Sequence, residues 1–582
     1  MAESIKKRYR IIIITGLIFL AIPVTGMLLI RLSSVQTYII QKITSRIGSS
    51  KGISISIGSI HLSFIKSVSI TDLLVLDNNN DTLIYTSSLK SGIRNISRSD
   101  KSVHLGRVTV MNPVFKVITD STGSNSLNSI LQALAKDTIK NQTGKPVIRI
   151  NQIDITGGRF ILQNNADSSI RSGYGIDFSN MAVNDINAVI EDFSIQDDTT
   201  SMSFYRASFT EISGFSVNRF SSRLIVTPGL IQFEEADIHT YASLVNSNFI
   251  SLSYDYPGAF RNFGNDVRMK LTFGDSFVDF GDLSYFIRTS IPDPGPVAFS
   301  GTVTGTLSEL RGRNIKLSAA DITSLNCDFD FSGLPDIENT YIFLDVSNLT
   351  TRLTELVSLK LADADIIPEN LDREAGRMTF RGTFSGFTTD FVTYGRLFTS
   401  AGTFSTDISF RPSGRNLFRY QGLLQGNAIE AGKLSGNPEL LGRVNFHLNV
   451  DGVSRSFRDF DAILEGQIDS ADFMGYVYRD IRLNGNFTEK TWDGSISMND
   501  ENLEFDFLGM LDFQKDVPEF DFSLNIPKAN LFNLNISKTD ETSSVNMLVT
   551  ANFTGNSIDN ASGEMRLLNS TVERKGRKLE IF

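Results

Sequence analysis

The sequence contains few of the residues that build covalent bridges or metal centres. Its 582 residues include one cysteine, Cys327, and four scattered histidines, His61, His104, His239 and His447. One cysteine cannot form a disulfide within the chain, and one Cys with four scattered His residues cannot build a Cys/His zinc site. A metal site built from carboxylates that are far apart in the sequence remains an alternative. The single cysteine fits a reducing compartment as well as an envelope protein without bridges.

Positive charge is dispersed along the chain and is concentrated only at the extreme N-terminus. The chain has 55 Lys and Arg residues against 65 Asp and Glu residues, a net charge of −10. Nucleic-acid binding needs a basic stripe that neutralises phosphates, and no such stripe follows the first ten residues. We therefore predict no nucleic-acid partner. A hydrophobic content of 41% argues against wholesale disorder.

Motifs of enzyme chemistry are missing as well. The sequence has no Walker loop, no GxSxG, no HExxH and no dinucleotide fingerprint after a strand. Carboxylates are abundant, but most alternate with apolar residues, and no pair stands out as the acid and base of a glycosidase. We predict no catalytic residue, no cofactor and no metal ligand.

Proline is rare, and no Pro-rich or Gly/Ser-rich linker divides the chain. A chain of this length would ordinarily form about four domains of ~150 residues, so one undivided architecture is an alternative. The strongest punctuation is Ile-Pro-Asp-Pro-Gly-Pro at 291–296, which predicts a loop between a first segment, 49–290, and a second segment, 297–582. The chain stops inside a predicted strand, which suggests a fragment of a longer protein.

A long hydrophobic run occurs once, at 11–30, and has the length of a membrane-spanning helix. Basic residues in 1–10 precede it, so the positive-inside rule predicts a cytoplasmic tail at 1–10, a single anchor at 11–30 and the remainder across the membrane. A cleaved signal peptide is the alternative, but the run exceeds the usual hydrophobic region of such peptides and no A-x-A site follows.

Residues 31–48 show apolar positions at helical spacing, with polar residues between them. We predict an amphipathic helix that caps the first strands. The alternative is a helix that lies on the membrane surface.

Beyond Gly52 the dominant hydrophobic period is two, which indicates antiparallel strands with one dry and one wet face. The clearest runs start at Val267, Leu325, Val444, Leu503, Phe520 and Val545. Short amphipathic helices are expected at 126–136 and 351–362. The polar cluster 77–81 predicts a turn between strands and not a calcium-binding loop, because it lacks the Gly and distal Glu of such a loop. The predicted fold is mainly β: an N-terminal transmembrane helix, then a long, curled antiparallel β-sheet with a few short helices.

The dry face is rich in phenylalanine, with 43 Phe residues in the chain against one Trp. Phe offers a large apolar surface without a polar group to satisfy. Composition favours an ordinary sandwich core, whereas the continuity of the strands favours a groove for acyl chains. The candidate groove-lining residues are Phe329, Phe331, Phe446, Leu448, Phe505, Phe507, Phe520, Phe522, Leu524, Val549 and Phe553.

Several ordered motifs resemble the AsmA-like superfamily and, within it, the TamB-type envelope proteins of Bacteroidetes. They are the anchor, Val35–Tyr38, Ile53–Gly58, Asp72–Asp77, Asp81–Tyr85, Phe299–Leu307, Gly333–Ile337, Gly382–Phe387, Asp390–Val392, Gly395 and Gly402–Phe404. Each Gly/Thr pattern is weak alone, and their order over nearly the whole chain carries the resemblance.

The resemblance implies an inner-membrane anchor, a periplasmic curled β-groove and bridge-like transfer of phospholipids toward the outer membrane. It also implies a possible outer-membrane barrel partner, although the TamB-type C-terminal region is missing from the sequence. The alternative is a scaffold or chaperone for outer-membrane protein translocation and assembly, whose sheet edge would pair with client strands.

Overall fold

The computed structural model describes residues 53–63, 67–77, 80–97, 99–119, 126, 147–165, 175–178, 180–286, 295–359, 369–414, 417–454, 461–557 and 560–581. The predicted tail, anchor and capping helix at 1–48 lie outside these residues, as does the helix predicted at 126–136 except for Ser126. Within the described ranges, no helix combines the length and apolar character needed to cross a membrane.

The chain divides into two compact units, up to Gly312 and from Arg313 onward. This division falls later than the predicted loop at 291–296, which lies mostly outside the described part.

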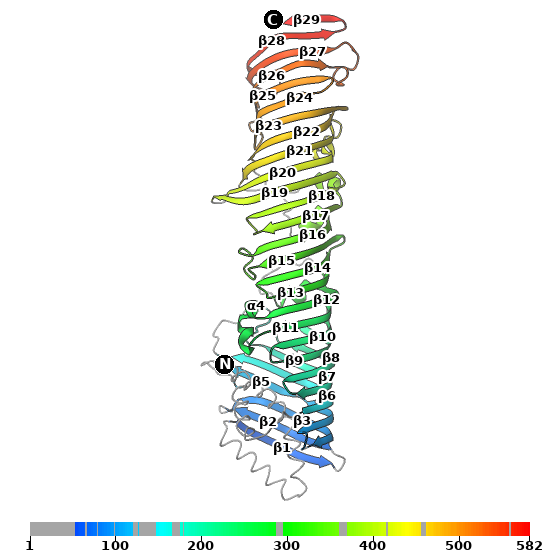
Figure 1. Ribbon diagram of the computed structural model, residues 1–582, viewed down its shortest axis with the longest axis vertical. Helices are drawn as coiled ribbons and strands as arrows, with labels where there is room; N and C mark the ends of the chain where they lie inside the picture. Colours follow the sequence, from blue (N-terminus) through cyan, green and yellow to red (C-terminus); the bar gives the residue numbers. More distant parts are fainter. Residues whose placement is uncertain are drawn as a thin grey trace. The chain divides into compact units, whose positions relative to one another are not determined.

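The first unit is built from strands joined mostly in sequence order (Figure 1). Its strands are β1 (Ile53–Ser63), β2 (Ser67–Asp77), β3 (Thr82–Ser97), β4 (Ser102–Met111), β5 (Val114–Thr119), β6 (Val147–Asn164), β7 (Ala182–Gln196), β8 (Thr199–Glu211), β9 (Ser216–Thr227), β10 (Leu230–His239), β11 (Leu244–Ser253), β12 (Arg268–Val278) and β13 (Val297–Gly305). Its short helices are η1 (Pro257–Asn262), α4 (Phe263–Asp266) and α5 (Phe280–Ser284).

One feature of the first unit departs from the antiparallel prediction. Strands β4 and β5 both pair with the long strand β6 in parallel. Parallel neighbours need a connection of a dozen or more residues, and the chain between Thr119 and Val147 provides one. The period-two pattern identifies a strand but does not set the direction of its neighbour, so the sequence could not reveal this exception.

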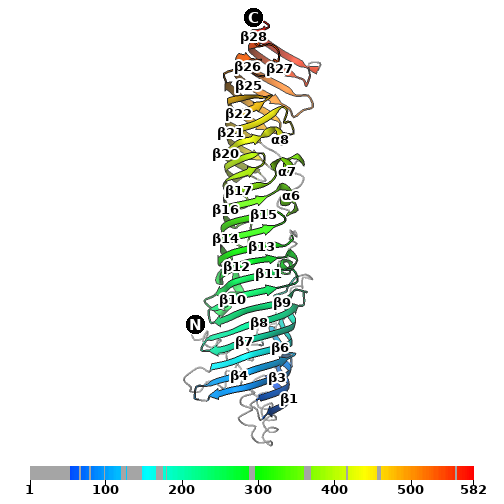
Figure 2. The same cartoon turned by 90° about the vertical axis from the view of Figure 1, so that its right-hand side faces the viewer.

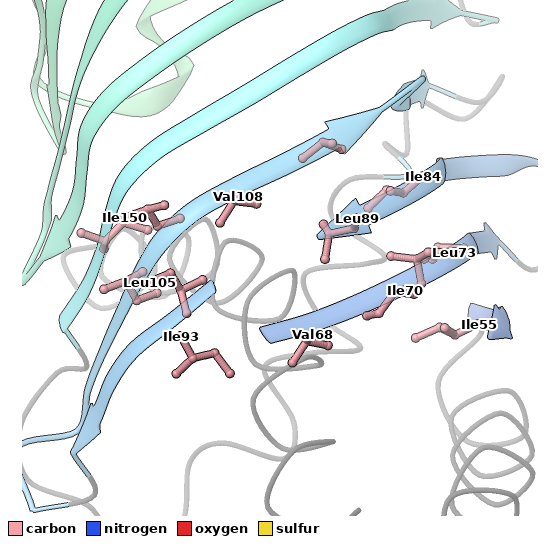
Figure 3. Packing of buried hydrophobic residues seen from close by; sticks show 14 of the residues in the cluster. Ile55, Val68, Ile70, Leu73, Ile84, Leu89, Ile93, Leu105, Val108 and Ile150 are labelled. Atoms are coloured by element: carbon pink, nitrogen blue, oxygen red, sulfur yellow. The ribbon is translucent and has the colours of Figure 1, made fainter. Parts of the chain in front are cut away.

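The deepest core of the molecule lies in the first strands of this unit (Figure 3). Ile70, Leu83 and Ile148 are almost fully buried, and each comes from a different strand, β2, β3 and β6. In β2 the buried residues Val68 and Ile70 alternate with half-buried polar ones, as expected for a strand with one face against the core. This core holds β1–β4, β6 and β7 together.

The second unit is a meander in which each strand from β15 to β29 pairs antiparallel with the next (Figure 2). Its strands are β15 (Thr323–Ser332), β16 (Tyr341–Thr351), β17 (Met378–Gly386), β18 (Phe391–Thr399), β19 (Gly402–Gly414), β20 (Leu417–Glu430), β21 (Leu441–Ser454), β22 (Asp461–Phe473), β23 (Tyr476–Thr488), β24 (Thr491–Asn499), β25 (Leu503–Asp512), β26 (Glu519–Asn530), β27 (Ser544–Thr554), β28 (Ser562–Arg574) and β29 (Arg577–Ile581). Strand β14 (Glu309–Ala319) contains the boundary between the units.

The alternating runs predict strands correctly: they coincide with β12, β15, β21, β25, β26 and β27. The short helices of the second unit are α6 (Leu353–Ser358), α7 (Glu369–Ala375) and α8 (Ala431–Ser435). Helix α6 confirms the described part of the helix predicted at 351–362. The turn predicted at 77–81 is described only in part, and in that part the Asn80 amide donates to the Asp77 carbonyl oxygen at 3.1 Å, as in a turn. The mainly β fold is therefore as predicted.

Glycines inside strands bend the sheet of the second unit. Gly422, Gly466 and Gly509 lie in mid-strand with φ of 153°, 156° and 148°, a region that is essentially restricted to glycine. A Cβ atom on Gly509 would lie 2.3 Å from the carbonyl oxygen of Asp521 on the neighbouring strand. Glycine kinks of this kind introduce curvature into a sheet, which fits the curled sheet predicted.

Candidate functional site

The register of the second unit places all eleven predicted groove residues on one side of its sheet. Residues directly opposite each other on antiparallel strands point to the same face, so their pairing traces rows across the strands. One row runs through Cys327, Val346, Gly382, Gly395, Thr406, Leu424, Leu448, Gly466, Leu483, Ile496, Phe507, Leu524, Val549 and Leu567. We call the side that carries this row the apolar face.

Two further rows of the apolar face follow the first, one after the other, on the same side of it. One contains Phe329, Leu344, Phe384, Thr393, Ile408, Gly422, Val450, Leu464, Gly485, Gly494, Gly509, Phe522, Ala551 and Met565. The other contains Phe331, Ile342, Gly386, Phe391, Phe410, Tyr420, Gly452, Ala462, Phe487, Trp492, Leu511, Phe520, Phe553 and Gly563. Phe446 and Phe505 lie two residues from Leu448 and Phe507, on the same face. None of these residues carries a charge.

The opposite side of the sheet has a different composition, and we call it the polar face. One of its rows runs through Asp328, Asp345, Thr383, Tyr394, Asp407, Leu423, Asn449, Glu465, Asn484, Ser495, Leu508, Ser523, Thr550 and Arg566. Ion pairs lie on this side, such as the one in which Arg419 donates to both Asp451 oxygens at 2.9 and 2.6 Å. This contact raises the pKa of Arg419.

The apolar face is not a closed core. Phe520, Phe522 and Phe553 are half-buried, whereas Phe507 and Val549 near the middle of their strands are 9% and 6% exposed. In a β-sandwich a second sheet would bury such rings completely. The half-burial fits the lining of an open groove better than it fits the sandwich alternative.

Phenylalanine rings form ladders across the strands. In β17–β20 the ring centroids of Phe384, Phe391, Phe410 and Phe418 are separated by 4.7, 5.1 and 4.9 Å in turn. These are favourable distances for aromatic pairs. The ladder gives a continuous apolar surface along one margin of the face, without a polar group between the rings.

A second ladder borders a hollow of about 700 Å³ near the C-terminal strands. The ring of Phe520 lies 5.7 Å from that of Phe513 and 4.8 Å from that of Phe553. These three rings line the hollow together with Pro518 and Met565. Its lining is large and mostly apolar, as expected of a place that accepts an acyl chain.

Sequence reasoning missed the pairing of rings with glycines on this face. A Cβ atom on Gly426 would lie 2.3 Å from the ring of Phe446, and one on Gly485 would lie 2.6 Å from the ring of Trp492. The rings therefore lie over glycines of the neighbouring strand. The signal in the sequence is glycine inside alternating runs, which indicates close approach.

The face offers little to a metal ion or a reactive cofactor. No cluster of three or more His, Cys, Asp or Glu residues that could hold a metal occurs among the residues described. Cys327 is buried in the face, and burial raises the pKa of its thiol. A protonated, inaccessible thiol is a poor nucleophile, so Cys327 serves packing.

The first unit carries an apolar face of its own. One row contains Met202, Leu224, Phe233, Ile250, Leu271 and Val303. A neighbouring row contains Ile195, Thr200, Val226, Ile231, Leu252, Met269 and Gly305. The run predicted from Val267 onward contributes Met269 and Leu271 to these rows, so each unit separately presents an uncharged surface.

Comparison with known proteins gives no relative, since no protein-family model, curated protein or solved structure matches the chain.

Proposed function

We propose that this chain is a bridge-like lipid-transfer protein of the cell envelope, whose apolar faces carry the acyl chains of phospholipids toward the outer membrane. The observation that supports this most directly is the uncharged apolar face across strands β15–β28, on which rings such as Phe520, Phe522 and Phe553 are only half-buried. Each acyl CH₂ group removed from water contributes about 0.8 kcal/mol, so such a face retains acyl chains. A charge on it would obstruct their movement.

The place of action is part of the proposal. The basic residues before the apolar run at 11–30 favour a single inner-membrane anchor with the β region in the periplasm. A reporter fused after Phe582 should then be active only outside the cytoplasm. Activity confined to the cytoplasm would contradict this arrangement.

A photocrosslinking experiment in cells tests the lipid path. A benzophenone amino acid replaces Phe522, on the apolar face, and in a matched variant replaces Ser523, on the polar face of the same strand. We expect phospholipid adducts from position 522 and none from position 523, both identified by mass spectrometry. Adducts of position 522 with outer-membrane polypeptides, and none with lipid, would instead favour the scaffold or chaperone role beside a barrel partner.

A further inference from the structure

One connection of the second unit differs from the tight turns around it. Residues Leu531–Ser543 between β26 and β27 form a long segment, which we call the strap. The amide of Asn535 donates to the carbonyl oxygen of Met474 at 3.3 Å, and the amide of Asn533 donates to Asn502 Oδ1 at 2.7 Å. These partners belong to the turns before β23 and before β25, so the strap crosses several hairpin ends on one margin of the sheet.

The strap also seals this margin of the apolar face. Leu534 is 1% exposed and belongs to a cluster with Ala529 and Val545. Tyr476, Tyr478, Leu503, Met547 and Val572 pack around this cluster. Leu503, Ala529, Val545 and Val572 are direct cross-strand partners, so they form the outermost row of the face here. An acyl chain reaching the face from this side must therefore pass beside the strap.

A hollow of about 810 Å³ lies at that point, between the strap and the turn that leads from α8 into β21. Its apolar lining comes from Leu440, Met474 and Phe532. Leu440 and Met474 are 47% and 45% exposed, so both are accessible to a ligand in the hollow. The hollow therefore offers accessible apolar side chains beside its polar ones.

Two opposite charges line the same hollow. Glu439 comes from the turn before β21 and Lys538 comes from the strap. Both are exposed, and neither forms an ion pair within 4.0 Å with any residue that the structure describes. The remaining polar lining residues, Asn533, Asn535 and Ser537, are uncharged. The hollow thus combines one anion and one cation, neither ion-paired among the described residues, with apolar side chains.

We infer that this hollow is a lateral access site for a phospholipid with a zwitterionic phosphoethanolamine headgroup. The Lys538 ammonium contacts the phosphate, the Glu439 carboxylate accepts hydrogen bonds from the headgroup ammonium, and the acyl chains lie on Leu440, Met474 and Phe532. A choline headgroup cannot donate such hydrogen bonds, and a glycerol headgroup leaves Glu439 facing an anionic lipid. The inference rests on the proposed function and specifies the lipid class that it handles.

The test uses the full chain and three soluble dihexanoyl probes, which carry phosphoethanolamine, phosphocholine or phosphoglycerol headgroups and a photoactivatable acyl chain. We expect the phosphoethanolamine probe to bind most tightly and to label the strap or the segment around Met474. Glu439→Gln should reduce its advantage over the phosphoglycerol probe, and Lys538→Gln should weaken all three, each by up to about fivefold, the range of one exposed charge pair.

Arg419→Gln and Asp451→Asn are the matched controls, because this ion pair lies on the polar face and should leave binding unchanged. Equal binding of the three probes, or variants at Glu439 and Lys538 that bind like the native chain, would overturn the headgroup site. Labelling along the apolar face in that case would leave the proposed function standing. Absence of acyl labelling on the face, with headgroup preference intact, would contradict the conduit and retain the site.

Discussion

The adjacent residues Phe507 and Leu508 provide the sharpest test of the two faces. Both are large and apolar, and they are neighbours in β25, so size and hydropathy do not distinguish them, and only the alternation along the strand does. The structure places Phe507 on the apolar face at 9% exposure and Leu508 on the polar face at 64% exposure. We predict opposite outcomes for Phe507→Asp and Leu508→Asp.

The magnitude follows from what each side chain contacts. The Phe507 ring lies 5.4 Å from that of Phe522 and opposite Ile496 and Leu524. Truncating a well-buried Phe costs about 3–5 kcal/mol, and an ionised carboxylate adds a desolvation cost. We therefore expect Phe507→Asp to destabilise the second unit by at least about 3 kcal/mol. Leu508 contributes little burial, so Leu508→Asp should change stability by no more than about 0.5 kcal/mol.

Urea unfolding followed by circular dichroism measures the stability, and photocrosslinked lipid on either side of β25 measures passage along the face. Protease resistance identifies conditions in which Phe507→Asp is folded, so that a block of lipid is separable from unfolding. Folded Phe507→Asp should carry no lipid past β25, whereas Leu508→Asp should carry it normally. Equal tolerance of both substitutions, in stability and in lipid passage, would refute the assignment of faces to functions.

Three other predictions concern single residues. Gly509→Ala should destabilise the protein by about 2 kcal/mol or more in urea unfolding, because the φ angle of Gly509 is 148°. The control Gly264→Ala, with nothing near the Cβ position, should leave the free energy of unfolding within about 0.5 kcal/mol of the native value. Equal effects of the two substitutions would contradict the kink at Gly509. Leu534→Ala should lower the free energy of unfolding by about 2–5 kcal/mol and speed limited proteolysis within the strap. Unchanged cleavage would show that Leu534 does not hold the strap against the sheet. The Thr542 hydroxyl lowers the pKa of Asp540. This contact therefore stabilises the fold above the ordinary carboxyl pKa of about 3.9, and the stabilisation is lost as the pH falls through the lowered pKa. The difference in urea midpoint between the native chain and Asp540→Asn should shrink in acid, and a pH-independent difference would refute this role of Asp540.

The sequence predicts the strands and their two faces because a half-buried sheet imposes a period of two. Leu508 and Met510 interrupt that period in the sequence, and Leu508 proves to be an exposed residue of the polar face. The apolar face is therefore predictable even where single residues are ambiguous. What binds to it is a separate question, which periodicity does not answer.

The strap shows why the rest could not be predicted. Leu534 and Ile536 alternate with Asn533 and Asn535, which is typical of another strand. The chain turns instead, with Asn535 at a φ of 63° and Leu534 buried against other strands. Its hydrogen bonds reach turns far away in the sequence, such as that at Met474. Long-range contacts of this kind override the local pattern, so the hollow beside the strap has no signature in the sequence.

The consecutive pairing of β15–β29 makes the hairpin a natural unit of insertion and deletion. Each strand from β16 to β28 pairs with its two chain neighbours, so loss of one complete hairpin would join two strands that already run in compatible directions. Loss of a single strand would reverse the direction of every later one and exchange the margins on which the turns lie. A lineage could therefore lengthen or shorten this unit two strands at a time while its uncharged surface stays continuous. Under the proposed function, the span of such a protein could follow the width of the gap between its two membranes without redesign of its chemistry.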